Sequence, residues 1–304
     1  TASRAVMKDV RRELAIQDVE AIITPKTFDR PELVLKVVKT ASGEKGDALV
    51  GQLRGLPALL REPSGGFFQP CGRASNCGIV FCPHVRGQMG IEEQAQRLQQ
   101  HFRVSVGIFS GKSPYSEDQP WEEKKRDTAR RFKENELTLL VATKAFGMGI
   151  DKPNIRYTIH LGIPSSLEAF YQEAGRAGRD RRQSMCVVLF SDDHPDRSRQ
   201  LLDLSIGAEE VARVFKETRD YSTDDDVSRM MFFHKKSFLG VASELKAIGI
   251  VVDLIGELDR PKQCDLPFGP PGARPTSTDD GRGVIEKALH RLVLLGVIRD
   301  YTVD

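Results

Sequence analysis

The sequence lacks the paired cysteines that would indicate a disulfide framework or a zinc site. Its five cysteines, at positions 71, 77, 82, 186 and 264, are an odd number and include no Cys-x-x-Cys. Cys82 and Cys186 lie within apolar runs that are typical of strands. We therefore expect reduced thiols, mostly buried, rather than cross-links or metal ligands.

Long apolar runs and a dominant charge sign are also missing. No stretch approaches the ~18 apolar residues of a membrane span, and the first residues do not form a secretion signal. An intracellular, cytoplasmic protein without membrane contact is expected. The 304 residues carry a net charge of +2, with a pI of about 8.2. Local clusters, not the average charge, must therefore indicate the partner.

Two parts of a nucleotide-hydrolysing site are absent. Gly111-Lys112-Ser113 follows a strand-like run, but a P-loop needs four residues between its glycines, and only three separate Gly107 from Gly111. The simpler interpretation of this segment is a strand that ends in a polar loop. The chain also contains no Asp-Glu dipeptide, so it has no D-E-x-H or D-E-x-D to hold a magnesium ion.

Between residues 26 and 192, apolar runs alternate with amphipathic helices. Strands are predicted at 33–39, 78–82, 104–109, 137–143, 157–162 and 184–190, and helices at 47–60, 91–102, 117–135 and 165–177. Strands that are apolar on both faces and separated by helices predict a parallel sheet with helices on both faces. A helix over 2–16 and a strand over 19–24 precede this α/β domain.

The remaining chain divides into three predicted segments. Residues 193–258 have helical periodicity, and because they contain no cysteine and only His194 and His234, zinc is not expected there. Residues 259–283 are rich in proline and glycine and predict a linker. Residues 284–304 predict a helix that stops at Gly296, followed by the start of a strand.

Residues 139–180 combine several features that suit phosphate. "GMGID" places Gly149 and Asp151 in a turn after a strand, and "QEAGRAGRD" holds Gln172, Arg176 and Arg179. Guanidinium groups are permanently charged forks that match phosphate oxygens. Each feature alone is more simply a glycine turn or a pair of surface arginines, but together they favour a phosphate site. The two arginines share a face if the helix continues, and fan from its end if Gly178 unwinds it.

These segments resemble known motifs. Residues 137–180 resemble motifs V and VI of superfamily 2 helicases, and "ATKAFGMGIDKPNIRYTIH" with "YQEAGRAGRD" is similar to the RecQ family in particular. "GIVFCPHVRG" (78–87) is similar to motif IV, "TFDRPEL" (27–33) to the connector between two motor domains, and "TAS" to the end of motif III. The resemblance implies a second RecA-like motor domain over 26–192, preceded by a remnant of the first over 1–25.

The resemblance also implies roles for individual residues. Arg179 would contact the γ-phosphate of ATP, while Arg176 and Gln172 bridge the phosphate and motif V. Gly149 and Asp151 would couple the nucleotide to the strand-binding loop, and the missing first domain would hold most of the ATP and Mg²⁺. Contacts to nucleic-acid backbone are expected from Thr143, Lys144, Arg86, Ser110 and Gly111. Lys144 is equally well a solvated loop lysine.

The C-terminal segment can be interpreted in two ways. The resemblance implies a partial winged-helix segment over 284–304, with Lys287 and Arg291 on DNA phosphates. A generic amphipathic helix fits the same residues.

The function expected from the resemblance is the C-terminal portion of an ATP-dependent 3′-to-5′ DNA helicase of the kind used in repair and recombination. Its partners would be single-stranded DNA and duplex junctions, and both chain ends look cut, as in a fragment. Without its first motor domain the chain is not expected to hydrolyse ATP. Two alternatives stay open: a non-catalytic nucleic-acid-binding or regulatory remnant, and an RNA helicase of the same superfamily.

Overall fold

The computed structural model describes residues 4–16, 18, 29–115, 120–146, 151–203, 205–217, 225–237, 241–256, 279–299 and 301. The chain groups into two compact units. The first unit comprises residues 1–204 with 214–230, and the second comprises residues 205–213 with 231–304. The domain boundaries expected from the sequence stay a prediction; the structure groups residues 195–202 and 226–230 with the sheet rather than with the helices that follow.

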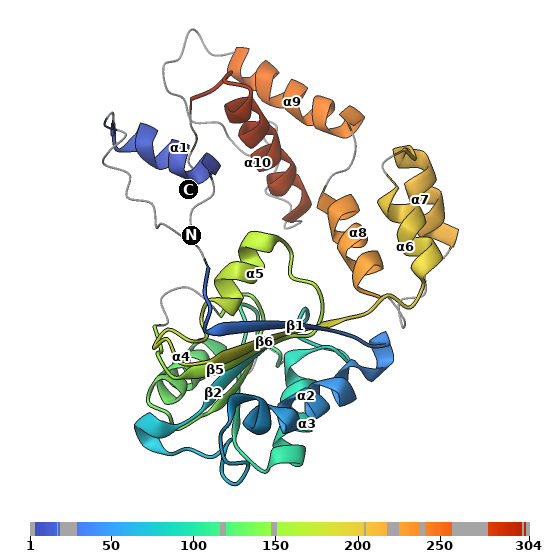
Figure 1. Ribbon diagram of the computed structural model, residues 1–304. Coiled ribbons are helices and arrows are strands. Elements are labelled where there is room, and N and C mark those ends of the chain that lie inside the picture. Colours follow the sequence, from blue (N-terminus) through green and yellow to red (C-terminus); the bar gives the residue numbers. More distant parts are fainter. Residues whose placement is uncertain are drawn as a thin grey trace. The chain divides into compact units, whose positions relative to one another are not determined.

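The first unit is built on a six-stranded parallel sheet with the order β1-β6-β5-β2-β4-β3 (Figure 1). Its strands are β1 (Leu33–Lys39), β2 (Cys77–Phe81), β3 (Val106–Phe109), β4 (Leu139–Ala142), β5 (Ile155–His160) and β6 (Ser184–Phe190). This is the predicted α/β class, and the predicted strand at 19–24 lies outside the described residues.

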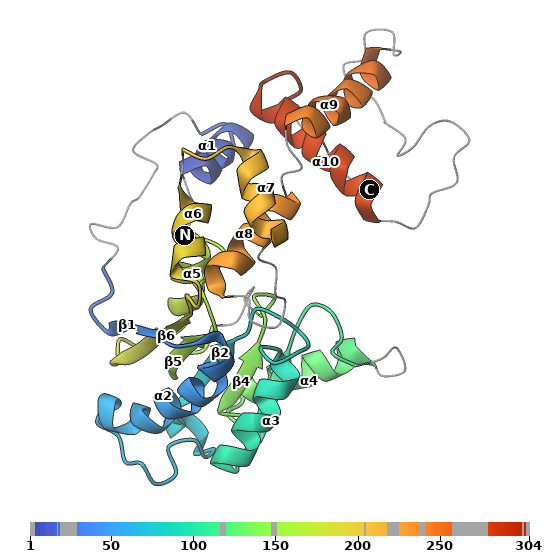
Figure 2. The same ribbon diagram turned by 90° about the vertical axis from the view of Figure 1, so that its right-hand side faces the viewer.

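The helices of the first unit alternate with these strands (Figure 2). They are α1 (Arg4–Glu13), α2 (Lys45–Leu60), α3 (Ile91–Phe102), α4 (Trp121–Lys133), α5 (Leu167–Ala174) and α6 (Pro195–Leu202), with short 3-10 turns η1 (Ser42–Glu44) and η2 (Gly72–Ala74). Two further helices, α7 (Ala208–Glu217) and α8 (Asp226–Ser237), begin in one unit and end in the other.

Two apolar clusters cover the two faces of the sheet. One includes Leu53 of α2, Leu98 of α3 and Tyr157 of β5. The other includes Phe132 of α4 and Ile79 of β2. Strands β2, β4 and β5 are buried at every residue; β2 and β4 are apolar throughout, whereas β5 also buries Arg156, Thr158 and His160. The central strands therefore lie within the core, and the loops emerge at the two edges of the sheet where these strands begin and end.

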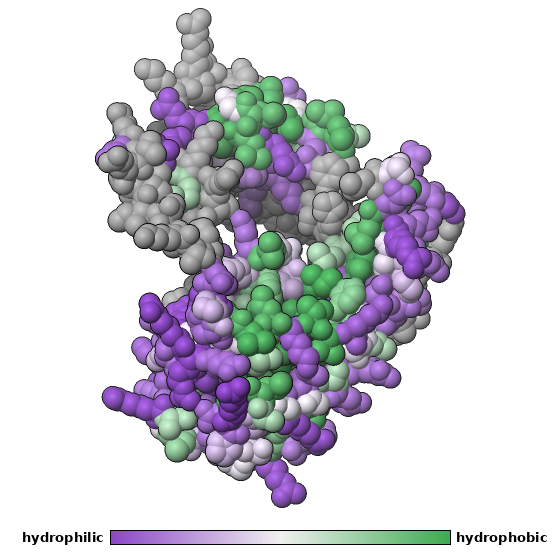
Figure 3. All heavy atoms as spheres, viewed as in Figure 1, coloured by the Kyte–Doolittle hydropathy of each residue, from purple (hydrophilic) through white to green (hydrophobic). Residues whose placement is uncertain are grey.

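The edge strand β1 departs from the prediction that all strands are covered on both faces. Leu35 is 61% exposed and Val37 is 70% exposed. Both point to the same face because side chains alternate along a strand. Figure 3 shows apolar side chains gathered over this part of the sheet. The β1 sequence alone does not distinguish an edge strand from a central one.

A buried ion-pair network joins the start of α8 to the sheet. The fully buried Asp226 carboxylate accepts from Lys45 Nζ at 2.7 Å and from the backbone N–H of Ser191 at 2.9 Å. Arg229 donates to the same carboxylate at 2.5 Å. Ser191 directly follows β6 and Lys45 begins α2, so the network lies at the carboxyl end of the sheet. It is the reason that the beginning of α8 belongs to the first unit.

The second unit contains α9 (Val241–Gly256) and α10 (Asp279–Leu294), which share a small apolar core. Gly296 follows α10 with a φ of 72°. The N–H groups of Gly296 and Val297 donate to the carbonyls of Val293 and Leu292. This is a Schellman stop, and it confirms the predicted helix end at Gly296. Residues 297–299 and 301, the described part of the C-terminus, contain no strand.

None of the helices in the described ranges has the length and apolarity that crossing a bilayer requires.

Candidate nucleotide and nucleic-acid interface

The predicted arginines lie in a turn that follows α5. The Ser166 hydroxyl caps this helix by accepting from the N–H of Ala169 at 3.0 Å. The helix ends at Ala174, three residues earlier than predicted. Gly178 has a φ of 66°, and its N–H donates to the carbonyl of Ile155 at 3.0 Å. Of the two geometries that the sequence left open, the structure has the arginines fanning from an unwound helix end.

Arg179 contacts the second predicted phosphate element directly. Its Nη1 donates to Asp151 Oδ1 at 2.7 Å, and the Asp151 side chain is 83% exposed. The two motifs around residues 151 and 176–179 are therefore adjacent in space. An ion pair this exposed contributes little to stability. An anion of higher charge could replace Asp151 as the partner of Arg179.

Arg176 is in a different environment. The residue is only 9% exposed, and within the part of the chain that the structure describes its buried Nε has no hydrogen-bond partner. Burial lowers the pKa of Arg176 from its usual value, the charge of Arg179 adds to this effect, and Glu173 opposes it. A buried Nε–H without a hydrogen-bond partner is costly, and an anion that accepted from it would remove that cost.

Neighbouring ion pairs fix this turn onto the sheet. Asp180 accepts from Arg156, which is 1% exposed at the start of β5. Burial alone would raise the pKa of Asp180, but the hydrogen bonds from Arg156 and from the N–H of Arg182, together with the charges of both arginines, outweigh it, and the net pKa is lowered. Glu173 Oε2 lies 3.1 Å from Nε2 of the buried His160. Gln172, by contrast, is exposed.

The predicted nucleic-acid residues follow β2, β4 and β3, three strands that are adjacent in the sheet. Arg86 is exposed, and its Nε donates to the carbonyl of Pro114 at 2.9 Å, which joins the loops after β2 and β3. Gly111 and Lys144 are exposed, and Thr143 is half-buried. The carboxyl ends of parallel strands meet at one edge, so these residues lie along it.

The Ser110 side chain is not placed to contact a nucleic-acid strand. The residue is fully buried, its hydroxyl donates to the carbonyl of Lys112, and its own carbonyl accepts from Trp121 Nε1 at 3.1 Å. Its polar atoms therefore hold the turn together, and the exposed part of this turn is Gly111 with Lys112.

In the second unit, Arg291 already has a partner within the protein. Its Nε lies 3.2 Å from Glu244 Oε2 and its Nη2 lies 3.5 Å from Glu244 Oε1, so the pair joins α10 to α9. Lys287 is exposed on α10. The winged-helix interpretation and the generic amphipathic helix both stay predictions for this segment.

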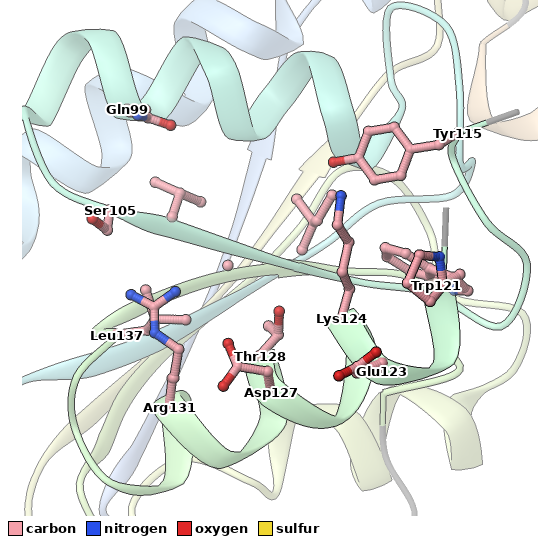
Figure 4. Close-up of a pocket in the computed structure, with 14 residues that line it drawn as sticks. Gln99, Ser105, Tyr115, Trp121, Glu123, Lys124, Asp127, Thr128, Arg131 and Leu137 are labelled. Carbon is pink, nitrogen blue, oxygen red and sulfur yellow. The ribbon is translucent and has the colours of Figure 1, made fainter. Parts of the chain in front are cut away.

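A cavity of about 570 Å³ lies elsewhere on the first unit, between α3, the edge strand β3 and α4 (Figure 4). Tyr115 and Trp121 lie at one end, and Gln99 and Arg131 lie near the other. None of the predicted site residues lines it. The candidate interface and this cavity are therefore separate features of the first unit.

Two expectations bear on metals and on the glycine turn. Among the described residues, no three or more His, Cys, Asp or Glu side chains gather as a metal site; the absence of zinc stays a prediction. Gly149 lies outside the described residues, so only Asp151 of the "GMGID" turn can be placed.

Comparison with known proteins supports the assignment of these motifs. Residues 68–181 match the helicase conserved C-terminal domain. The chain is 34% identical over 242 residues to the ATP-dependent DNA helicase RecQ of Bacillus subtilis, covering 78% of this chain and 36% of that protein. It is 34% identical over 202 residues to the mouse bifunctional 3′-5′ exonuclease/ATP-dependent helicase WRN, covering 66% of this chain and 13% of that protein.

Two further similarities were found. A putative ATP-dependent RNA helicase, R290, of Acanthamoeba polyphaga mimivirus is 33% identical over 192 residues, covering 63% of this chain and 29% of that protein. Among solved structures, domain 2 of the Mss116p DEAD-box helicase bound to an RNA duplex is 19% identical, with a TM-score of 0.41 over 74% of this chain and 75% of that chain.

The parallel sheet and the clustered motifs therefore belong to a superfamily 2 helicase C-terminal domain. Within that class, the domain is RecQ-like. The chain spans 36% of the length of its Bacillus subtilis relative and less of the mouse and mimivirus proteins.

Several residues near the site were not predicted. They hold the arginine turn or α5 in place, and they are Arg30, Glu32, Arg156, His160 and Glu173. Arg30 and Glu32 lie in the quoted "TFDRPEL" and Glu173 in "QEAGRAGRD", but only the folded chain places them against the turn.

Proposed function

We propose that this chain supplies phosphate-contacting arginines and part of the strand grip of an ATP-dependent DNA helicase of the RecQ kind. The observation that carries the proposal is the position of Arg176 and Arg179 in one turn, with Arg179 in contact with Asp151 of the second phosphate motif. Two clustered cations, one of them paired only with the exposed carboxylate of Asp151, suit the phosphates of ATP.

ATP would be held largely by a first motor domain that lies outside these 304 residues, since the sequence has no P-loop and no Asp-Glu pair for Mg²⁺. In this proposal Arg179 leaves Asp151 and contacts the γ-phosphate, while Arg176 and Gln172 contact phosphate and the 151 segment. Arginines supplied across a cleft in this way are worth about 10³–10⁵ in rate.

The segment between β4 and β5 would couple the nucleotide to the strand. It begins with Thr143 at the carboxyl end of β4 and reaches Asp151 before the start of β5, so it has one end at each edge of the parallel sheet. Displacing Asp151 when Arg179 turns to phosphate would act on the same segment that presents Thr143 and Lys144. Gly149 would supply the turn.

Single-stranded DNA would lie along the carboxyl edge of β2, β4 and β3. Arg86, Gly111, Thr143 and Lys144 offer charge, a backbone N–H and a hydroxyl, which suit phosphates and do not read bases. DNA as substrate and 3′-to-5′ movement rest on the resemblance to RecQ proteins, and a role in repair or recombination follows from the same resemblance.

One test concerns ATP hydrolysis. The 304-residue chain alone should show no turnover. Grafted in place of the matching segment of the Bacillus subtilis relative, it should support hydrolysis, and Arg179→Ala should lower kcat about 10³-fold or more. Arg199→Ala on α6 is the control, because that side chain is 77% exposed and pairs only locally with Asp196. Turnover by the isolated chain that Arg179→Ala abolishes would contradict the proposal.

A second test concerns the strand. The chain should bind a labelled single-stranded DNA at low salt, and Arg86→Ala or Lys144→Ala should weaken binding and reduce its salt dependence. Lys36→Ala on β1 is the control because it is exposed on an edge strand away from these loops. An equal loss of DNA binding in all three variants would contradict the assignment of the binding surface to the carboxyl edge of β2, β4 and β3. Tighter binding of the same sequence in RNA would favour an RNA helicase.

A further inference from the structure

The segment just before β1 enters the sheet beside the arginine turn. The N–H of Leu33 donates to the carbonyl of Arg30 at 2.8 Å, and the N–H of Ser184 donates to the carbonyl of Glu32 at 2.8 Å. Ser184 is the first residue of β6. Residues 30–32 are therefore fixed next to the start of β6, which the chain reaches directly after the turn.

The Arg30 side chain holds two consecutive carbonyls of that turn. Its Nη2 lies 3.1 Å from the carbonyl oxygen of Ala177 and 3.2 Å from that of Gly178. Its Nε donates to Glu32. Both accepting carbonyls lie between Arg176 and Arg179 in the sequence. One guanidinium thus spans the backbone that determines how the two predicted phosphate ligands diverge.

The glycines of the motif leave room for this contact. A Cβ on Gly178 would lie 3.0 Å from Glu32 Cγ and 3.2 Å from Ser184 Oγ. A Cβ on Gly175 would lie 3.9 Å from Arg30 Nη1 and 2.7 Å from the carbonyl oxygen of Tyr171. The close approach of residues 30–32 therefore requires a small residue at 178, where the positive φ already favours glycine.

Glu32 keeps Arg30 from acting as a third phosphate ligand. The Glu32 side chain is 14% exposed and is ion-paired with Arg30, whose side chain is 29% exposed. The hydrogen bond from Arg30 is the largest cause of a lowered pKa at Glu32, so the carboxylate stays charged near neutral pH. With its charge balanced, the guanidinium is available to hold carbonyls rather than an external anion.

We propose that Arg30 is a positioning residue for the arginine turn, and that the segment before β1 acts on the phosphate contacts through it. This inference rests on the proposed function, in which Arg176 and Arg179 contact phosphate. A displacement of residues 30–32 first changes the contacts of Arg30 with the carbonyls of Ala177 and Gly178. The relative orientation of the Arg176 and Arg179 side chains then changes, without any movement of the central strands.

Hydrogen exchange on the intact 304-residue chain tests the positioning. The reporters are the N–H groups of Gly178 and Arg181, which donate to the carbonyls of Ile155 and Gly178, and the reference is the N–H of Leu161, which donates within the sheet to Phe81. Arg30→Ala should speed exchange of the reporters about tenfold or more, the value expected for lost hydrogen bonds from a charged donor. The reference should be unchanged.

Two further variants guard against a general loss of stability. Arg30→Lys keeps the charge but not the fork, so it should loosen the turn by an intermediate factor. Arg199→Ala removes an exposed arginine elsewhere and should change neither set of amides. Acceleration of the reporters and the reference by the same factor in Arg30→Lys would overturn the proposal, because it would show a role in stability only.

Titration with inorganic tripolyphosphate separates this inference from the proposed function. In the unaltered chain, the side-chain Nε–H signal of Arg179 should shift on addition, and Arg30→Ala should weaken the response. No response in the unaltered chain, with a turn that still loosens in Arg30→Ala, would refute phosphate binding by the arginine turn in the isolated chain and leave the positioning role standing. A response and a turn that are both unaffected by Arg30→Ala would refute the positioning role alone.

Discussion

Buried cations in this protein differ in how they are neutralised. Lys45 meets the carboxylate of Asp226, and Arg156 meets that of Asp180, so each charge is balanced within the domain. The Nε atoms of Arg156 and Arg176 both lack a hydrogen-bond partner in the described ranges, but the Arg156 guanidinium reaches a carboxylate through its Nη2. Because removing a charge from water requires a compensating partner, an external anion at Arg176 would supply what Asp180 supplies to Arg156.

The Lys45–Asp226 pair predicts a dependence of stability on pH. Burial lowers the pKa of Lys45 to about 8, with Asp226 opposing the shift. An unfolded lysine keeps its proton up to its ordinary pKa of 10.5. Between these values the unfolded state binds more protons, so the free energy of unfolding should rise with pH, by at most ~1.4 kcal/mol per pH unit.

Urea denaturation from pH 7 to 10.5 measures this effect as the difference between the unaltered chain and Lys45→Met. The variant should be less stable throughout, by about 1.5–3 kcal/mol at neutral pH, because Asp226 loses one of its charged donors and keeps Arg229 and the N–H of Ser191. The other titrating groups are common to both proteins, so only the slope above pH 8 reports Lys45. Parallel stability curves over that interval would contradict the lowered pKa.

At the scale of elements, two glycine substitutions should act in opposite directions. Gly51 lies on an exposed position of α2, and a Cβ there would meet nothing within 4 Å. Gly51→Ala should therefore raise the free energy of unfolding by about 0.5–1 kcal/mol through helix propensity. In β2, a Cβ on Gly78 would lie 1.9 Å from the ring of Tyr157. Gly78→Ala should lower it by about 1–3 kcal/mol through overpacking.

Denaturation midpoints of the two variants check this pair of predictions. A stabilising Gly78→Ala would mean that Tyr157 has room to move, and that the fully buried core around it is less tightly packed than the structure indicates. A destabilising Gly51→Ala would argue against the position of Gly51 within α2.

The elements themselves are largely predictable from local pattern. Strand β6 has the predicted bounds. A continuous apolar run between two helices is typical of a strand that is buried on both faces of a parallel sheet. The end of α5 was predicted three residues late because Gly175 and Arg176 do not by themselves break a helical pattern. What ends it is tertiary: the N–H of Gly178 pairs with Ile155 at the start of β5.

The site was predictable only in part, for the same reason. Asp151 and Arg179 were identified from motif chemistry, and their 2.7 Å contact agrees with a shared site. The contact of Arg30 with Ala177 joins residues 147 positions apart, and no local pattern reports it. Ser110 has the same polar hydroxyl whether it faces solvent or its own turn, so its burial could not be inferred.

At the scale of the whole molecule, the first unit includes residues well beyond the last strand of its sheet. Asp225 and Asp226 begin α8 far along the chain, yet both are fully buried. Asp225 accepts from the N–H of His194 at 3.3 Å, and Asp226 accepts from Lys45. The cooperative unit should therefore extend past the last strand and include the start of α8.

Truncation tests that boundary. A fragment of residues 1–237 keeps Asp226 and should unfold in urea with the midpoint of the first unit in the full chain. A fragment of residues 1–203 removes it and leaves Lys45 buried without its carboxylate, which should cost about 3–5 kcal/mol. Lys45→Met provides the matched control: it should destabilise the longer fragment and leave the shorter one unchanged or more stable. Equal midpoints for the two unaltered fragments would place the boundary at the end of β6 instead, and would reduce the buried pair to a contact that the sheet does not need.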